Sequence, residues 1–228
     1  MRTAWPIVLV AGVVMGPQQG VKTVAVSSVS VPRDLRSLAG PRAQFDSLIS
    51  SSLRREGFAV VPAQVSESIW LRLRDSIGGY FDSYTGKLIE AKLQMVHEGT
   101  LRELRDRHGV DAWLHSEIEF VGAPFTGGKV KWHGTEQESG ATGGLGGFLF
   151  GTKKGSVPAL SLFVSLEDTL GKEVYAGVGG IQLTTRVQGD RFVDVPPLSL
   201  LADSARNAAA VHLALDSLPA HLAAHVGR

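Results

Sequence analysis

Residues 101–120 read LRELRDRHGVDAWLHSEIEF, and this stretch decides the fold. Thr100 and Glu103 have the spacing of a capping box that opens a helix, and Gly109 is the residue type that closes one. Beyond it the period changes to two, which predicts a half-exposed strand over 110–121. One face of that strand carries Ala112, Leu114, Ile118 and Phe120, and the other carries Trp113, His115, Glu117 and Glu119.

Strands and helices alternate before this stretch. Residues 21–31 are rich in β-branched side chains and stop at Pro32, as a strand does. Gly99 marks either a break between two helices or a weak point within one. The other elements that we expect are a helix over 44–56 ending at Gly57, a short buried strand over 58–62, a helix capped by Ser66 that ends at Gly78 and Gly79, and a helix over 87–98.

The second half of the chain predicts a sheet completed by a hairpin. Strands are expected over 129–137, 159–166 and 173–183, with a tight turn over 167–171 and a bulge or bend at the glycines of the last strand. Residues 198–215 predict a helix whose small side chains pack closely on the sheet. The pattern therefore predicts one α/β domain over 21–216, with helices packed on an open sheet of mixed parallel and antiparallel strands.

Composition excludes several classes of function. The chain of 228 residues carries 23 basic and 22 acidic side chains, so no global field attracts nucleic acid or an anionic membrane. It contains no cysteine, which excludes disulfides, thiolate metal sites, cysteine nucleophiles and lipid attachment through cysteine.

The N-terminus points to export. Arg2 precedes an apolar run over 4–15 that ends in small residues, the order found in a secretory signal peptide. We expect residues 1–20 to be a signal peptide or an N-terminal anchor, with the cleavage position open, and residues 217–228 to be a tail. The alternative for the run is a buried first strand. Export predicts a location in the periplasm or at the outer-membrane periphery of a bacterium.

Residues 140–156, GATGGLGGFLFGTKKGS, resemble a phosphate-binding loop but lack its chemistry. Gly146 and Gly151 have the right separation, yet threonine precedes lysine at 152–153, and the segment that follows is a strand rather than a helix. The segment predicts a long connection between strands. Its apolar triplet predicts either burial under the sheet or contact with a partner or membrane, through Phe148, Leu149 and Phe150.

A second loop over 80–87, YFDSYTGK, gathers aromatic side chains. A calcium loop is excluded there, because Phe81, Ser83 and Lys92 fall where carboxylates are required. The loop is a candidate contact surface, with packing onto the core as the alternative. Its candidate contact residues are Tyr80, Phe81 and Tyr84.

The order of these segments carries a resemblance to a known group. Strand VAV at 24–26, REGFAVVP at 55–62, the stretch 101–120 and the hairpin LSLFVSLEDTLGKEVYAG at 160–177 resemble the α/β domain of bacterial envelope proteins. The group includes the CsgG-like curli-secretion lipoproteins, the penicillin-binding-protein activator LpoB and the amino-terminal domain of TolB. Its Gly-x-Asp and its turn with Asp and Gly correspond to residues 109–111 and to Asp168 with Gly171.

The resemblance covers most of residues 21–215 and implies a non-enzymatic role in envelope assembly or complex formation. It implies no cofactor, and it implies other envelope proteins or a second copy as partners. Two departures matter, because the chain has no lipid-bearing cysteine and nothing that matches a membrane-spanning hairpin. Pore formation is therefore not carried over, and membrane contact is expected only through the N-terminus or the loop 140–156.

An enzymatic alternative stays open at this point. No Gly-x-Ser-x-Gly elbow exposes a serine nucleophile. His115 and Glu117 share a strand face and His133 lies on the next predicted strand, so a metal-assisted hydrolase is conceivable, although solvent-facing polar residues give the same pattern. His221 and His225 share a helical face but lack the further ligands that a metal needs. The two readings are thus an exported binding or assembly module and a metal-dependent hydrolase.

Overall fold

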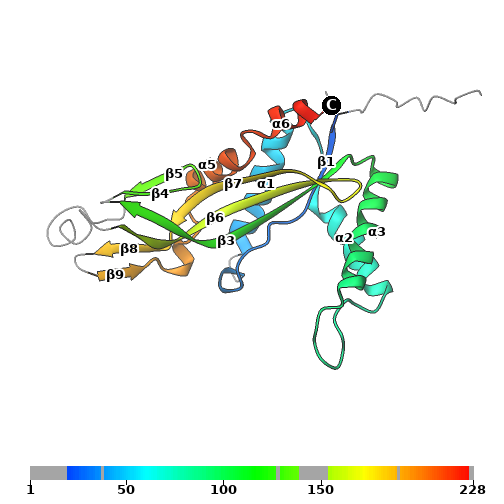
Figure 1. Ribbon diagram of the computed structural model, residues 1–228, viewed down its shortest axis with the longest axis horizontal. Helices are drawn as coiled ribbons and strands as arrows, with labels where there is room; N and C mark the ends of the chain where they lie inside the picture. The colour runs from blue at the N-terminus through cyan, green and yellow to red at the C-terminus, as the bar shows by residue number, and fades with distance from the viewer. Residues whose placement is uncertain (1–19, 37–38, 127–128, 139–153, 189–190, 226–228) are drawn as a thin grey trace, which may run out of the picture.

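The computed structural model describes residues 20–36, 39–126, 129–138, 154–188 and 191–225. Its centre is a mixed sheet of seven strands among these residues, with helices packed on both faces (Figure 1). This confirms the predicted α/β fold class. The expected leader over 1–20 lies almost entirely outside the described residues.

The parallel part of the sheet contains its first strands. β1 (Thr23–Val26) lies between β2 (Ala59–Val61) and β3 (Ala112–Thr126) and is parallel to both. Parallel neighbours need crossover connections, and these are α1 (Ala39–Arg55) before β2, then α2 (Ala63–Ser76) and α3 (Glu90–His108) before β3. The strand expected over 21–31 is shorter, and after it only Ser30 bridges to Glu117.

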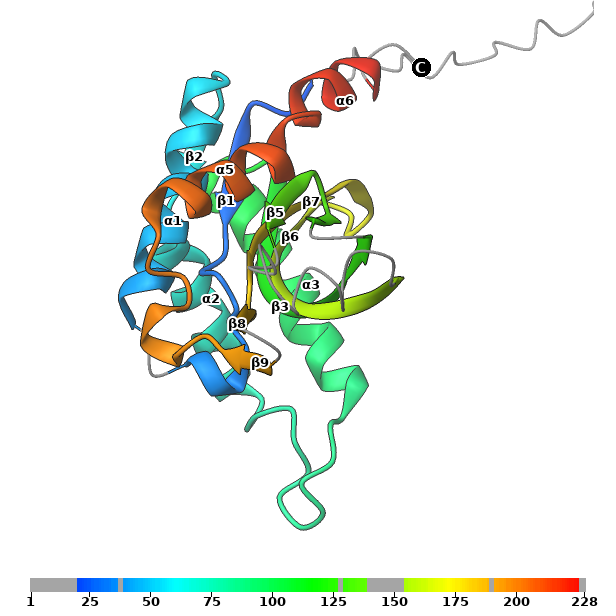
Figure 2. The same ribbon diagram turned by 90° about the vertical axis from the view of Figure 1, so that its left-hand side faces the viewer.

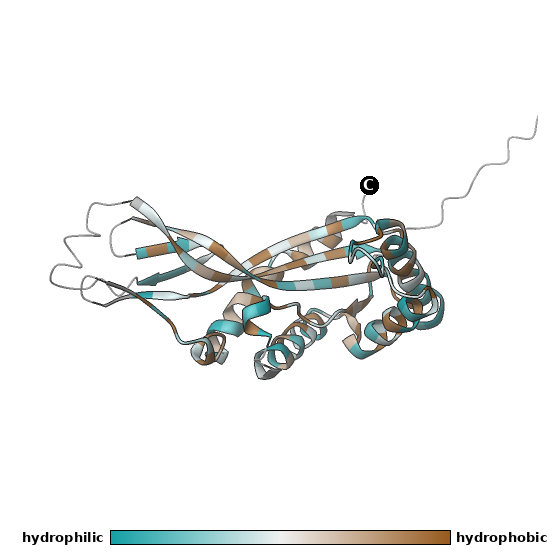
Figure 3. Ribbon diagram, turned by 90° about the horizontal axis from the view of Figure 1, so that it is seen from below, coloured by the Kyte–Doolittle hydropathy of each residue, from teal (hydrophilic) through white to brown (hydrophobic). Residues whose placement is uncertain are grey.

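The antiparallel part forms the long arm of the molecule. β3 pairs along its whole length with β6 (Lys154–Asp168), which pairs with β7 (Glu173–Leu183). Gly171 adopts a φ of 78° in the connecting turn, and the register shifts between Leu160 and Ser161, so the predicted turn and bulge are confirmed. Hydrophobic and hydrophilic residues alternate along these strands (Figure 3).

The strand predicted over 129–137 is instead a hairpin. β4 (Lys129–Trp132) and β5 (Thr135–Glu138) pair antiparallel around a turn in which His133 and Gly134 have φ values of 42° and 77°. Two consecutive residues with positive φ match the twist of a tight hairpin. The alternating pattern continues on both sides of the turn, so the sequence did not reveal the reversal.

After β7, the chain differs from the prediction both before and after the expected C-terminal helix. β8 (Thr185–Gln188) and β9 (Arg191–Asp194) form a separate small sheet. Two 3-10 turns, η1 (Arg33–Leu35) and η2 (Pro197–Ser199), precede helices, and α5 (Ser204–Leu215) begins at the N-cap Asp203 rather than at 198. Residues expected as a tail form α6 (Leu218–His225), whose Leu218 and Leu222 are buried in the main core.

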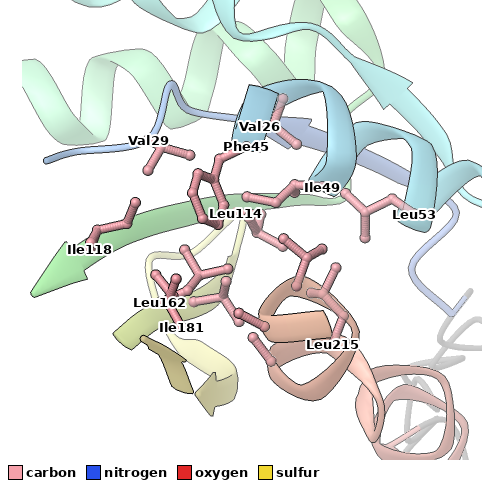
Figure 4. Close-up of a cluster of buried hydrophobic side chains, with 14 of the residues drawn as sticks. Val26, Val29, Phe45, Ile49, Leu53, Leu114, Ile118, Leu162, Ile181 and Leu215 are labelled. Atoms are coloured by element: carbon pink, nitrogen blue, oxygen red, sulfur yellow. The ribbon is translucent and has the colours of Figure 1, made fainter. Parts of the chain in front are cut away.

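The main core lies between the sheet and the helices α1, α5 and α6. Phe45 and Ile49 of α1 meet Leu114 and Ile118 of β3 (Figure 4). The close approach predicted for α5 is confirmed at the glycines of β7. A Cβ atom on Gly177 or Gly179 would overlap the carbonyl oxygen of Ala214 or Ala210.

A smaller core lies on the opposite face of the sheet, under α2 and α3. Trp113, predicted to face solvent, is buried there, whereas Phe120, predicted to be buried, is 46% exposed. The alternation of β3 identifies two faces, but the helices decide where each face is covered. The core consists of Ala25, Ile69, Leu101, Leu104, Val110 and Trp113.

Three local predictions about α2 and α3 are wrong or resolved. Ser66 does not cap α2 but lies inside it, where its hydroxyl donates to the carbonyl oxygen of Val26. α3 runs unbroken through Gly99, against which the side chain of Leu73 packs. Thr100 is buried within α3 and forms no capping box, because its hydroxyl donates to the carbonyl oxygen of Val96.

The prediction that the short strand β2 is buried is also wrong. β2 pairs only with β1, and its Ala59 is exposed.

Candidate functional site

The face of the sheet that carries Trp113 is covered at its two ends. At one end, α2 and α3 lie over Trp113. At the other end, the β4–β5 hairpin folds over the sheet, where the backbone N–H of Gly180 donates to the carbonyl of His133 at 2.9 Å. The stretch of β3 and β6 between these two covers is open to solvent, and it includes the half-buried Phe163 and the exposed Glu117.

A cleft of about 960 Å³ lies where α2 and α3 meet this open stretch. We call it the helical cleft. Its wall from α2 and the following loop is aromatic and basic, its wall from the segment after β1 is serine-rich, and its floor comes from β3 and β6. The lining residues are Ser27, Ser28, Ser30, Arg42, Ser66, Glu67, Trp70, Leu71, Arg74, Tyr80, His97, Trp113, His115 and Glu167.

A half-buried carboxylate joins two histidines on the floor of the helical cleft. Glu167 accepts hydrogen bonds from Nε2 of His115 at 2.7 Å and from Nε2 of His97 at 3.0 Å. Burial raises the pKa of Glu167, but the hydrogen bonds from His115 and His97 outweigh it and lower that pKa to about 2. The hydrogen bond to Glu167 raises the pKa of His97 against the opposing effect of burial. The network therefore ties α3 to two strands of the sheet through charge-assisted hydrogen bonds.

His115 also has a partner on its second ring nitrogen. Its Nδ1 lies 3.1 Å from Oγ of Ser27, the first residue after β1. A serine, a histidine and a carboxylate in series have the composition of a hydrolase triad. The hydroxyl of Ser27, however, donates to the carbonyl of Leu114 at 3.0 Å, and Ser27 follows an extended strand rather than a strained elbow. The arrangement fixes the ring of His115 and does not activate Ser27.

Aromatic rings form the wall beside this network. Trp70 contacts Tyr80 edge-on at 6.2 Å and lies 6.1 Å from Trp113, and the ring of His97 stacks on Trp113 at 5.6 Å. Trp113 is 3% exposed, and its Nε1–H has no hydrogen-bond acceptor among the described residues. Such a group usually has a partner, so an acceptor in the helical cleft would satisfy a donor that the fold leaves free.

A second cleft of about 580 Å³ adjoins the first on the open sheet. We call it the sheet cleft. Its lining includes Phe163 and Val178 and the exposed carboxylates of Glu117 and Glu173. The two clefts share Ser27, Ser28, Ser30 and His115.

The proposed metal set does not come together. His133 lies in the β4–β5 turn, where its Nδ1 hydrogen-bonds to Ser161, whereas His115 pairs in register with Ser165. Four residues of strand separate these two serines, which is roughly 13 Å. Within the part of the chain that the structure describes, no three histidine, cysteine or acidic residues are grouped to hold a metal. The side chains of His221 and His225 lie outside that part.

The candidate contact residues of the aromatic loop have two different surroundings. Tyr80 lines the helical cleft, whereas Phe81 and Tyr84 are 57% and 97% exposed on a loop that projects from the molecule (Figures 1 and 2). Oδ1 of Asp82 accepts from the backbone N–H groups of Tyr84 and Thr85, which shapes the loop without a calcium ion. Phe148, Leu149 and Phe150 lie outside the described residues.

Sequence reasoning missed the residues that make the helical cleft. Glu167 was expected only as part of a turn, and His97 and Trp70 only as parts of helices. The available signal was Trp113 beside His115 on the polar face of a strand, because a tryptophan there indicates that something covers that face.

No protein-family model matches this chain, and comparison with curated proteins finds no relative. Among solved structures, the crystal structure of lipoprotein GNA1162 from Neisseria meningitidis is similar, with 17% sequence identity and a TM-score of 0.35. The match covers 71% of this chain and 82% of that one. This neighbour is a bacterial lipoprotein outside the groups named from the sequence pattern, whose resemblance stays an expectation. Of the helices described, none has the length and apolarity needed to cross a membrane.

Proposed function

We propose that this chain is an exported, envelope-associated and non-enzymatic module that binds a partner or ligand in the helical cleft. The observation that carries the proposal is the cleft itself. Its aromatic wall stands beside a floor on which Glu167 is hydrogen-bonded to both His97 and His115. Apolar walls with a few fixed polar groups are the usual form of a binding site.

The binding reading accounts for the geometry better than hydrolysis does. The hydroxyl of Ser27 donates its hydrogen bond to a backbone carbonyl. His133 forms a hydrogen bond with Ser161, which lies far from His115 along the sheet. The floor therefore offers orientation and hydrogen bonds rather than a nucleophile. Export is supported by the leader-like pattern over 1–20. The exposed Phe81 and Tyr84 extend the proposed contact surface beyond the cleft.

Photo-crosslinking in cells tests the proposal. A benzophenone amino acid replaces Leu71, which lines the helical cleft and is 46% exposed, or Tyr84 at the projecting loop. The matched control is the same replacement at Leu198, which is 82% exposed and lines neither cleft. We expect defined crosslinked products in the envelope fraction from Leu71 and Tyr84.

Two results would contradict the proposal. Products of equal yield from Leu198 would show that the crosslinks are nonspecific. If the chain stays in the cytoplasmic fraction, with residues 1–20 uncleaved and not bound to a membrane, the protein is not exported and that part of the proposal is wrong.

A further inference from the structure

We propose that the helical and sheet clefts form one groove that binds an extended peptide carrying a basic side chain near an apolar or aromatic one. The inference rests on the proposed function and names the chemistry of the ligand. Four lining residues belong to both clefts, namely Ser27, Ser28, Ser30 and His115. The groove thus runs without interruption from α2 and α3 onto the open sheet.

The size of the groove favours a chain-like ligand. Its halves measure about 960 and 580 Å³. A pocket for a small molecule typically has roughly 300–1,000 Å³. The helical half is already at the upper end of that range, and it continues through the shared lining onto the sheet half. A continuous site of this extent suits an extended segment better than a compact ligand.

The free charge of the groove is negative and lies in the sheet half. Glu117 and Glu173 are exposed, and neither forms an ion pair with any described residue. The lining of that half contains no lysine or arginine. Glu117 and Glu173 lie on the strands that flank β6, at register positions four residues apart, so each can meet its own lysine or arginine of the ligand. Such complementarity selects partners by charge.

The charges of the helical half are already compensated. Arg42 pairs with Glu67 at 3.1 Å, and Arg74 pairs with its neighbour Asp75 at 2.7 Å. Glu167 is held by two histidines. What this half presents is aromatic and apolar surface from Trp70, Tyr80 and Leu71, which suits an apolar or aromatic side chain.

One buried polar group without a partner borders the helical half. Nε1–H of Trp113 has no acceptor among the described residues. A peptide backbone supplies carbonyl groups along its length, so it can provide this acceptor. A glycan also supplies hydroxyl partners, but it offers no positive charge to Glu117 and Glu173. The carboxylates therefore favour a peptide.

Affinity selection with the full chain tests the inference. Two pools of capped, randomised heptapeptides are used, identical except for two fixed positions that hold lysine in one pool and glutamate in the other. The immobilised protein is exposed to an equal mixture, and the retained peptides are counted by mass spectrometry. We expect the lysine pool to be enriched about tenfold at low salt, with less enrichment at high salt because the carboxylates are exposed.

Charge reversal in the groove sharpens the test. The double variant Glu117→Lys/Glu173→Lys should reverse the preference and retain the glutamate pool. Both side chains are exposed, so the fold should survive, which circular dichroism checks. The matched control Glu56→Lys/Glu90→Lys makes the same change in net charge at exposed positions outside both clefts, and it should retain the lysine pool.

Several outcomes would overturn the inference. These are equal retention of the two pools, a preference that the control variant also reverses, or binding of chitotetraose that both peptide pools fail to displace. The last outcome would make the groove a carbohydrate site. In each case a specific crosslink from Leu71 would leave the proposed function standing, so the two failures are distinguishable.

Discussion

Gly179 lies where α5 crosses β7, and its missing side chain sets the distance between helix and sheet. A Cβ atom there would overlap the backbone carbonyl of Ala210, which no side-chain rotation can relieve. We expect Gly179→Ala to lower the free energy of unfolding by about 1–3 kcal/mol, the usual cost of overpacking a core. Urea denaturation measures the change.

Gly40→Ala is the matched control for this substitution. Gly40 lies exposed in α1, and a Cβ atom there would meet nothing within 4 Å. Alanine favours helix more than glycine does, but the ring of the following Pro41 disfavours a side chain there, so this variant should change stability by less than about 1 kcal/mol. Equal stability of the Gly179→Ala and wild-type proteins would show that α5 moves away at no cost.

Glu167 is the residue whose charge state couples stability to pH. Its pKa falls from 4.5 to about 2 on folding, so its contribution is present above pH 4.5 and is lost as the pH falls toward 2. The pKa of His97 rises above 6.5 on folding, so its contribution is present below pH 6.5 and is lost as the pH rises through the folded value. Both contributions are complete only between about pH 4.5 and 6.5.

Glu167→Gln should therefore destabilise the protein most within that window. We expect a loss of roughly 2 kcal/mol there, because the charge that stabilises two imidazole donors is removed. The difference from wild type should shrink as the pH rises through the folded pKa of His97 and as it falls below about 3. Thermal melts across this pH range measure it, and a difference that is constant with pH would contradict the assigned roles of Glu167 and His97.

At these positions the sequence predicted side-chain direction but not surroundings. The alternation in β3 placed His115 and Glu117 on one face, as the structure has them. It could not show that α2 and α3 cover Trp113 or that the cover ends before Phe120. The two hydrogen-bond partners of Glu167 lie 52 and 70 residues away from it in the sequence. A pattern of neighbouring residues cannot predict contacts over such separations.

At the scale of elements, Gly109 and Asp111 make the connection from α3 to β3. Gly109 ends the helix with a φ of 61°. Two residues later, Oδ2 of Asp111 accepts from the backbone N–H groups of Lys22 and Thr23, both at 2.8 Å. The carboxylate thereby holds the start of β1 in place against β3.

Asp111→Ala should loosen this connection. It leaves two backbone donors at the start of β1 without their acceptor, so we expect a loss of about 1–3 kcal/mol. Asp111→Asn keeps a side-chain oxygen and should lose less than half of that. Thermal unfolding compares the two variants, for which 1 kcal/mol corresponds to roughly 2–4 °C at this chain length. Equal melting temperatures for the two variants would contradict the acceptor role.

Elements with a strong local signal were predictable, and those fixed by tertiary contacts were not. The period of α1, the glycine turn before β7 and the small residues of α5 each carried their own evidence. The reversal at His133 had no such signal, because it interrupts an alternating pattern with only two residues of positive φ. That reversal removes His133 from the strand on which the metal hypothesis depended.

For the whole molecule, the main core and the core under α2 and α3 lie on opposite faces of the sheet and are unequal, while a third cluster lies between the sheet and the β4–β5 hairpin. The main core joins β3, β6 and β7 to α1, α5 and α6. The core under α2 and α3 contains six buried hydrophobic residues, which are Ala25, Ile69, Leu101, Leu104, Val110 and Trp113. The sequence predicted the helices but not which face of the sheet each helix covers, because that depends on the side of the sheet on which each crossover connection passes.

Unequal cores predict unequal local stability. Less apolar area holds α2 and α3 to the sheet, so this pair should open before the rest of the fold. Hydrogen exchange followed by mass spectrometry, in low concentrations of urea, should show faster exchange in residues 63–108 than in β6 and β7. The His97–Glu167 bond is the main polar tie between α3 and the sheet. Exchange in 63–108, corrected for the intrinsic effect of pH, should therefore accelerate above the pKa of His97.

Glu167→Gln separates this opening from global unfolding. In this variant, the backbone amides of residues 63–108 should exchange faster at pH 6. The order of exchange rates among β6, β7 and α5 should stay the same, because those elements pack in the main core. Since the helical cleft lies between α2, α3 and the sheet, the same opening would disrupt the groove while the main core stays folded. Uniform protection across both cores, or an equal increase everywhere in the variant, would show that the molecule opens as one unit.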